Sequence, residues 1–323
     1  MLIEGKWIDD ADRIAAASCR TLSPKWSSTS TICEVGSPVS RYILVASYSC
    51  PWSHATLIAR NILGLCELIP VHIAGGPRIQ GYRLADEGPI AFPNVSSSAT
   101  DGPVRHVHQL YTATDPNYTG RATVPVLWDS QNCKLVLGDS ADILQWLDAV
   151  SAQSGSAQPG VRLHPEDQRG DMEHLLELLR GQLAEPIYRA GLAREQSVYD
   201  HAVDQVFSSL DKLNSMLESR RFLLGPWLSA CDIRLFCLLV RFDAAYLPLF
   251  RITRKRIADY QGLWAFARDV MAWPGVRVTV DMQAIVEGYF LNDGDTNPHR
   301  IVPEAPDLDW TPDPDRRRLG STA

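Results

Sequence analysis

A cysteine stands where a strand-like segment gives way to a helical one. Residues 41–47, RYILVAS, are rich in β-branched and aromatic side chains and predict a buried strand. Cys50 follows, and Pro51 comes next. Proline has no N–H group, which suits the first turn of a helix because the N–H groups there have no partner within the helix. The N-terminus of a helix stabilises the thiolate form of a cysteine, which is the nucleophilic form. Cys50 is therefore a candidate nucleophile.

The residues after Cys50 indicate which thiol chemistry to expect. The stretch CPWS resembles the CPxC motif of dithiol redox proteins, with Ser53 in place of the second cysteine. An oxidised Cys50 would then need an external thiol to reduce it, so the pattern predicts monothiol chemistry. His54 lies one helical turn on, where packing is the more common role of a lone histidine. No third ligand accompanies the pair, and no metal site is predicted.

Two further motifs could bind a peptide-like ligand. In TVPV (123–126) a proline interrupts a strand-like segment, as a cis-proline does when it exposes the preceding backbone to an extended peptide; an ordinary edge proline is the alternative. At GDSAD (138–142), Ser140 could cap the start of a helix, and the negative charge of Asp139 would interact favourably with the helix dipole. Alternatively, the helix start and Ser140 could hold a carboxylate while Asp139 binds an ammonium group. A γ-glutamyl group carries both charges on one carbon.

The elements that must position these residues form two groups. Strands are predicted at 41–47, 67–74, 122–129 and 133–138, and helices after Pro51 and over 139–150. From 170 to about 290 the pattern is helical, and SACD (229–232) is a helix start signal. The predicted organisation is an N-terminal extension (1–40), a β-α-β domain with a hairpin and a closing helix (41–150, with an insertion at about 75–120), a linker (151–169), an all-helical domain (170–290) and a tail (291–323).

Composition restricts the class of partner. The net charge of −7 argues against nucleic acid or an anionic membrane surface, which would favour a basic face. The one tight basic run, 316–318, is interpreted as a solvated part of the tail. The most apolar stretch, 222–250, is interrupted by charges and predicts a buried helix rather than a membrane span. An odd number of scattered cysteines, seven in all, is typical of the reducing cytoplasm.

Over about residues 41–310, the chain resembles the xi-class glutathione transferases, the glutathionyl-hydroquinone reductases. The stretches that carry the resemblance are CPWSHATLIAR, GRATVPVLWD, DIRLFCLLVRFDAAY, KRIADY, WPGV and TNPHRIVPEAP. The resemblance implies an α/β thioredoxin-like N-terminal domain plus an all-α C-terminal domain, which together form the glutathione transferase fold. It also implies a cytoplasmic homodimer.

The resemblance further implies a reaction with glutathione as cosubstrate and without a metal. Cys50 corresponds to the catalytic cysteine, which removes glutathione from an aromatic conjugate of the hydroquinone type through a mixed disulfide. A second glutathione then reduces that disulfide and leaves as oxidised glutathione. Tyr188 and Tyr289 correspond to tyrosines that line the hydroquinone pocket, and either could protonate the leaving aromatic carbon.

The resemblance also implies which residues contact glutathione, and some of these residues differ from those usual in the family. Arg121 would bind a carboxylate of glutathione, Val124 would contact it through its backbone, and Asp139 and Ser140 would hold the γ-glutamyl end. Asp139 stands where the family usually has glutamate. Tyr82 stands where the family has a tryptophan near glutathione.

Two other functions stay open at this point. A glutathione-conjugating or thiol-transferase enzyme acting on a specialised metabolite is one, although Cys50 and the thiol of glutathione would form a disulfide instead of a conjugate. The other is a non-catalytic ligand-binding protein of the same fold. The changes at Tyr82 and at Ala55, where the family usually has an arginine, favour that second alternative.

Overall fold

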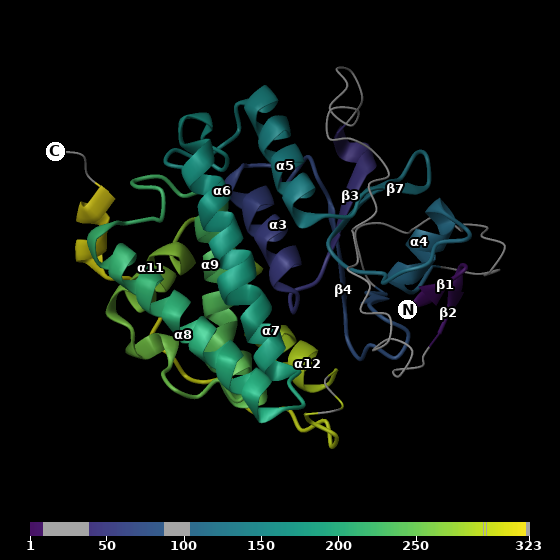
Figure 1. Ribbon diagram of the computed structural model, residues 1–323. Helices are drawn as coiled ribbons and strands as arrows, with labels where there is room; N and C mark the ends of the chain where they lie inside the picture. Colours follow the sequence, from purple (N-terminus) through teal and green to yellow (C-terminus); the bar gives the residue numbers. More distant parts are fainter. Residues whose placement is uncertain (9–38, 87–103, 293, 295, 321–323) are drawn as a thin grey trace. The chain divides into compact units, whose positions relative to one another are not determined.

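The structure is a computed structural model that describes residues 1–8, 39–86, 104–292, 294 and 296–320 (Figure 1). Internal contacts divide the chain into two compact units. The first unit consists of Met1–Arg60 and Gly64–Ser156, and the second of Asn61–Leu63 and Ala157–Ala323.

A five-stranded mixed sheet with strand order β5-β4-β3-β6-β7 forms the first unit. Its strands are β3 (Tyr42–Ala46), β4 (Val71–Gly75), β5 (Arg83–Leu84), β6 (Val126–Asp129) and β7 (Lys134–Leu137). β3 is central and fully buried, parallel to β4 and antiparallel to β6. The predicted strands are present, but β4 and β6 each begin four residues later than predicted. Pro70 and Pro125 directly precede these starts, and proline cannot donate a ladder hydrogen bond.

Helices lie on both sides of this sheet, α3 and α5 on one and α4 on the other (Figure 1). They are α3 (Pro51–Ile62), α4 (Val107–Thr114) and α5 (Ser140–Ser154). α5 continues past the predicted end at 150 until Gly155, whose φ of 64° ends it. α4 and β5 fall in the segment interpreted as an insertion, which is therefore not wholly irregular. Residues 87–103 lie outside the described residues.

The N-terminal extension also contains regular structure, which the strands predicted from the sequence do not include. β1 (Leu2–Ile3) and β2 (Lys6–Trp7) form an antiparallel pair. The Leu2 side chain is fully buried, and its backbone exchanges two hydrogen bonds with Gly120. These short strands gain their stability from contacts distant in sequence, which no local pattern predicts. Residues 9–38 lie outside the described residues.

The second unit is helical, as the sequence predicts. Its α-helices are α6 (Arg169–Glu177), α7 (Glu185–Gly191), α8 (Gln196–Ser219), α9 (Ala230–Arg241), α10 (Leu247–Leu249), α11 (Gln261–Met271) and α12 (Met282–Phe290). Two π-helical segments widen these helices, η3 (Leu178–Ala184) between α6 and α7 and η4 (Phe242–Tyr246) between α9 and α10. All residues of α9 except Arg234 are buried, which confirms its prediction as a central helix.

α9 begins at a buried capping box, as SACD predicts. The carboxylate of Asp232 accepts hydrogen bonds from the backbone N–H and the hydroxyl of Ser229 and from the N–H of Leu223. Ser229 and Asp232 are 1% and 0% exposed, so water cannot replace these bonds. The box fixes where the central helix starts.

Arg316 anchors the tail. This corrects the interpretation of the basic run 316–318 as solvated, because Arg316 is buried. Arg316 lies in the 3₁₀ helix η7 (Pro314–Gly320) and is only 4% exposed. Its guanidinium donates to the carbonyls of Leu217, Arg220 and Arg221 at the end of α8, at 2.9, 3.0 and 2.9 Å. Burial lowers the pKa of Arg316 to about 10. Four-fifths of the Arg318 side chain, by contrast, is exposed.

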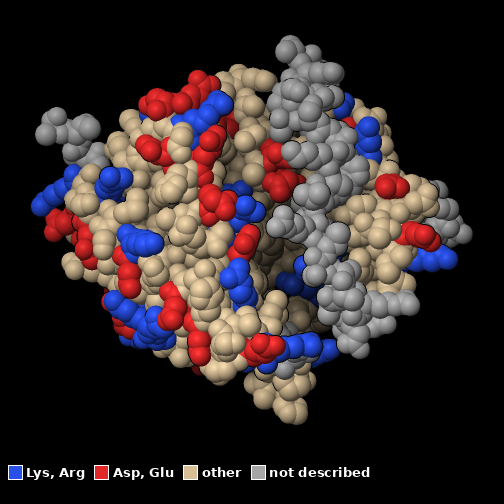
Figure 2. Space-filling model, in the orientation of Figure 1, with Lys and Arg blue, Asp and Glu red and all other residues tan. Residues whose placement is uncertain are grey.

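Acidic and basic side chains interleave on the face drawn in Figure 2. Arg180–Glu177 and Arg254–Asp204 are examples of exposed ion pairs in the protein. Among the described helices, none has an apolar stretch long enough to cross a bilayer.

Asp232→Ala should lower the free energy of unfolding by about 2–4 kcal/mol, because it leaves buried N–H groups without an acceptor. Asp204→Ala is the matched control: it removes an exposed carboxylate paired with Arg254 and should cost less than about 1 kcal/mol. Urea unfolding followed by circular dichroism measures both. Equal losses in the two variants would contradict the role of the capping box.

The same carboxyl should make stability depend on pH. Burial raises the pKa of Asp232 to about 6, against about 3.9 for an unfolded aspartate. The folded chain therefore holds the proton more tightly, and the stabilisation is complete below about pH 4 and is lost as the pH rises through about 6. Relative to Asp232→Asn, the free energy of unfolding of the wild type should fall by about 3 kcal/mol from pH 4 to pH 7. A flat or rising difference would refute this assignment.

Candidate active site

The thiol of Cys50 lies at the turn between β3 and α3. The backbone carbonyl of Cys50 accepts a hydrogen bond from the N–H of His54 (2.9 Å), so Cys50 starts the hydrogen-bond ladder of α3. The residue is 7% exposed, and its Sγ lies 3.4 Å from the carbonyl oxygen of Val124. The predicted nucleophile and the predicted backbone contact are therefore neighbours.

The peptide bond between Val124 and Pro125 is cis, which confirms that prediction. The segment before it is held by Tyr111 of α4, whose hydroxyl donates to the carbonyl of Thr123 (3.0 Å) and accepts its N–H (3.1 Å). Tyr111 is fully buried, and burial raises its pKa to about 12, so it stays protonated. No sequence pattern around Tyr111 indicated this role.

The start of α5 differs in one detail from the expectation. Asp139, and not Ser140, is the N-cap residue, and its carboxylate accepts the N–H of Ala141 at 2.7 Å. Ser140 is the first helical residue, and both side chains are partly exposed. Asp139 thus carries a negative charge at the start of α5 in a position that solvent reaches.

Tyr82 is linked to the turn that bears the thiol. The Arg78 guanidinium lies 4.3 Å from the centre of the Tyr82 ring and donates to the Ser49 hydroxyl at 3.3 Å. Sequence reasoning missed Arg78. Arg121, predicted to bind a carboxylate, has an exposed side chain in the segment that leads to Val124.

The three residues that share the first turns of α3 with Cys50 are buried. Ser53, His54 and Ala55 are each 0% exposed. The burial of His54 is in keeping with the packing role that is usual for a lone histidine. Ser53 does not reach the surface, so it is poorly placed to activate a bound thiol in place of Cys50.

The hydroxyl groups of three tyrosines in the second unit are linked by hydrogen bonds. The Tyr289 oxygen lies 2.7 Å from that of Tyr188 and 3.0 Å from that of Tyr246. We call Tyr188, Tyr246 and Tyr289 the tyrosine cluster. The structure thus brings the predicted pair together and adds Tyr246 from η4, which sequence reasoning missed although the stretch LVRFDAAY contains it.

The tyrosine cluster is closely packed around Phe250. The ring centre of Phe250 lies 5.6, 5.7 and 6.0 Å from those of Tyr246, Tyr188 and Tyr289. Burial raises the pKa of Tyr188 and of Tyr246 well above the ordinary value, so both are phenols at neutral pH. Tyr246 is fully buried, while Tyr188 and Tyr289 are half-buried. The cluster is thus a hydrogen-bonded chain of three hydroxyl groups in which Tyr289 is the middle member, and two of its residues, Tyr188 and Tyr289, are partly exposed.

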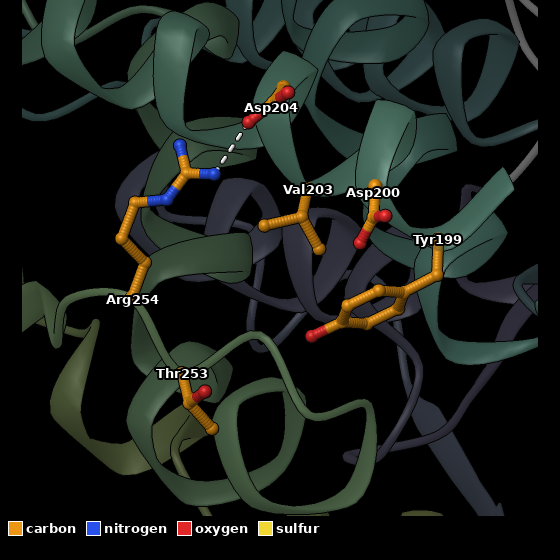
Figure 3. Close-up of a pocket in the computed structure, with 6 residues that line it drawn as sticks. All are labelled: Tyr199, Asp200, Val203, Asp204, Thr253 and Arg254. Carbon is orange, nitrogen blue, oxygen red and sulfur yellow. Dashed lines mark hydrogen bonds and ion pairs between the residues drawn. The ribbon is translucent and has the colours of Figure 1, made fainter. Parts of the chain in front are cut away.

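A cleft of about 480 Å³ opens elsewhere in the second unit (Figure 3). It is lined by Tyr199, Asp200, Val203, Asp204, Thr253 and Arg254, none of them a predicted site residue. Asp204 pairs with Arg254, Asp200 accepts from Gln196, and the Tyr199 hydroxyl donates to the Arg251 carbonyl. The charged side chains that line the cleft thus already have partners, Asp204 and Arg254 each other and Asp200 the side chain of Gln196. Within the described part of the chain, no three His, Cys, Asp or Glu side chains are grouped as metal ligands.

Comparisons with known proteins identify the family of the chain. The glutathione S-transferase N-terminal and C-terminal domain models match residues 49–150 and 196–269. The chain is 36% identical over 275 residues to glutathionyl-hydroquinone reductase YqjG of Escherichia coli K12, covering 83% of this chain and 81% of the relative. It is 34% identical to PcpF of Sphingobium chlorophenolicum, of the same name, covering 82% and 83%.

Solved structures decide the class. A xi-class glutathione transferase from Natrialba magadii superposes with a TM-score of 0.86 at 31% identity, covering 98% of this chain and 97% of that one. The chain belongs to the xi class of the glutathione transferases. The glutathione-bound structure of E. coli YqjG, with a TM-score of 0.76 at 34% identity, covers 83% and 86%. The xi-class resemblance and the fold class predicted from the sequence are confirmed.

Gly191→Ala should disturb the tyrosine cluster of this xi-class enzyme. A Cβ at Gly191 would lie 2.4 Å from ring atoms of Phe250, which packs against all three tyrosines. We expect a loss of about 1–3 kcal/mol in the free energy of unfolding and a changed near-ultraviolet circular dichroism spectrum. Gly170→Ala is the control, since nothing lies within 4 Å of its new Cβ. An unchanged spectrum in Gly191→Ala would contradict the packing described here.

Proposed function

We propose that the protein removes glutathione from aromatic thioethers of the glutathionyl-hydroquinone type, with Cys50 as the nucleophile. The Cys50 thiolate attacks the thioether sulfur, the sulfur–aryl bond breaks, and a Cys50–glutathione disulfide forms. The electron pair of the broken bond stays on the aryl carbon, which takes up a proton as the hydroquinone leaves. A second glutathione thiolate then attacks the disulfide, releasing oxidised glutathione and the Cys50 thiolate.

The contact between Cys50 and Val124 carries this proposal. An extended peptide that pairs with the backbone beside a cis-proline hydrogen-bonds to the carbonyl of the preceding residue. Here the Val124 carbonyl has the reactive sulfur 3.4 Å away. A glutathione whose central N–H bound this carbonyl would have its own sulfur beside Cys50, as mixed-disulfide formation requires.

The other contacts follow from the charges of glutathione. Its γ-glutamyl ammonium would bind Asp139, while the adjacent carboxylate would bind Ser140 at the positive end of the α5 dipole. The exposed Arg121 guanidinium would bind the other carboxylate, and Tyr82 would pack against the tripeptide. Asp139 already uses one oxygen as the N-cap of α5, which leaves its second oxygen for the ammonium group.

The tyrosine cluster supports the aromatic half of the reaction. Tyr188 and Tyr289 share a hydroxyl–hydroxyl hydrogen bond of 2.7 Å, and either can donate a proton to the leaving carbon and be reprotonated through the other. The proposal requires that one substrate molecule reach both Cys50 and this pair. The names of the E. coli and Sphingobium relatives support a hydroquinone conjugate as substrate.

The proposal extends to the setting of the enzyme. Glutathione is its cosubstrate and no metal takes part. Family resemblance supports a homodimer. The odd number and scattered positions of the seven cysteines in the sequence support the reducing cytoplasm as its location.

Labelling with oxidised glutathione followed by peptide mass spectrometry tests the nucleophile. Cys50 should gain the mass of one glutathione, and Cys50→Ser should lose at least about 10³-fold in release of menadione from glutathionyl-menadione, because the attacking group is gone. Cys66→Ser is the matched control, since Cys66 is exposed and should be dispensable.

Each alternative function gives a different result. A Cys50→Ser variant that gained conjugating activity would indicate a conjugating transferase, and wild-type protein with neither a Cys50 adduct nor turnover would indicate a non-catalytic binder. The first result would favour the conjugating alternative, and the second would overturn the proposed function.

A further inference from the structure

An exposed guanidinium is tied to the turn that bears the thiol. Arg78 belongs to the loop between β4 and β5, and its side chain is exposed. Its Nη2 donates to the hydroxyl of Ser49, the residue before Cys50, at 3.3 Å, and its guanidinium carbon lies 4.3 Å from the centre of the Tyr82 ring. Ser49 is only 5% exposed, so the cation is attached to a buried part of the thiol turn.

The loop that carries Arg78 is also held in place at its far end. Gly81 has a φ of 71°, and a Cβ at this position would lie 2.9 Å from the ring of Trp7 in β2, so the indole packs directly over the backbone here. The carbonyl of Tyr82 accepts the N–H of Val107, the first residue of α4, at 2.9 Å. A loop fixed in this way loses little further freedom when it binds a ligand, which favours recognition.

The strand directions place Arg78 relative to the other proposed contacts of glutathione. β3, β4 and β7 run in one direction, and β6 runs in the opposite direction. The ends of β3, β4 and β7 and the start of β6 therefore lie at the same edge of the sheet. Since the strand order is β4-β3-β6-β7, this edge carries first the loop with Arg78, then Cys50, then Val124 and finally Asp139.

A glutathione that binds as proposed can run in only one direction along this edge. Its γ-glutamyl group would lie at Asp139, after β7, and its cysteinyl group would pair with Val124 beside Cys50, so its glycyl group would continue toward β4. Neighbouring strands lie about 4.8 Å apart, which separates β7 from β3 by roughly 10 Å. An extended tripeptide spans about 10 Å. Its last carboxylate would therefore end near the turn where Ser49 holds the Arg78 guanidinium.

A guanidinium held at this position suits a carboxylate. It has five N–H donors in one plane, and two parallel donors match the two oxygens of a carboxylate. Stacking on the Tyr82 ring involves the face of that plane, so it orients the guanidinium without using a donor. The hydrogen bond to Ser49 comes from one nitrogen, Nη2.

We propose that Arg78 binds the glycyl carboxylate of glutathione and is a specificity-determining residue for the thiol that this enzyme uses. The inference rests on the proposed function, in which Arg121 binds the same carboxylate, and adds a second cation from the loop after β4. A thiol compound without a carboxylate at this end would lose the interaction. Because Arg78 also bonds to Ser49, recognition of the tripeptide is linked to the turn that bears the nucleophile.

Binding of an unreactive ligand tests this contact apart from the reaction. S-Methylglutathione has the whole tripeptide but no aryl leaving group, and its glycyl ethyl ester replaces the negative carboxylate with a neutral group. Isothermal titration calorimetry with both ligands measures the affinities of wild type, Arg78→Met and Arg78→Lys. Arg83→Met is the matched control, since Arg83 is a nearby exposed arginine that pairs with Asp86.

Arg78→Met should bind S-methylglutathione about 5- to 20-fold more weakly than wild type, because a charge-assisted hydrogen bond is lost. Its affinity for the ester should stay within about twofold of wild type, since that ligand has no carboxylate to lose. Arg78→Lys keeps the charge but not the planar fork, and should lose about 2- to 5-fold. Arg83→Met should change neither affinity by more than about twofold. Circular dichroism checks that each variant folds.

Two results would overturn the inference. Equal weakening of both ligands in Arg78→Met would indicate a structural role, and an unchanged affinity for S-methylglutathione would leave the carboxylate to Arg121 alone. Turnover of glutathionyl-menadione tests the proposed function separately. Wild-type protein that binds S-methylglutathione through Arg78 but releases no menadione would contradict the proposed reaction and still support this contact.

Discussion

The antiparallel pairing of β3 with β6 determines where the chemistry can occur. Val45 lies opposite Val126, so the chain leaves β3 at the same edge where it enters β6. Cys50 follows the first of these points and Val124 precedes the second, and their contact at 3.4 Å is a result of this register. A slip of one residue would turn every side chain of β3 to the opposite face and move the thiol turn away from the cis-proline.

Local signals predicted much of the fold of both units. The apolar run of β3, Pro51 at the start of α3, the proline in TVPV and the S-x-x-D start of α9 each depend on neighbours in sequence, and each is confirmed. The register itself depends on the pairing of distant segments. No pattern within either strand contains that information.

The features that sequence reasoning missed all depend on contacts between distant residues. The β1–β2 pair is held by Gly120, and Arg78 matters because its loop reaches Ser49. Tyr246 looks like an ordinary packing residue until Tyr289, 43 positions later, bonds to its hydroxyl.

Arg316 shows how the tail contributes to the helical unit. The last carbonyls of any α-helix have no partner within it, and at the end of α8 a side chain almost a hundred residues later supplies the donors. Shortening the chain for expression or crystallisation at a site before Arg316 would leave these carbonyl oxygens at the end of α8 without the donors that Arg316 supplies. Affinity tags and fusion partners are therefore better attached in a way that retains Arg316 and its hydrogen bonds to the end of α8.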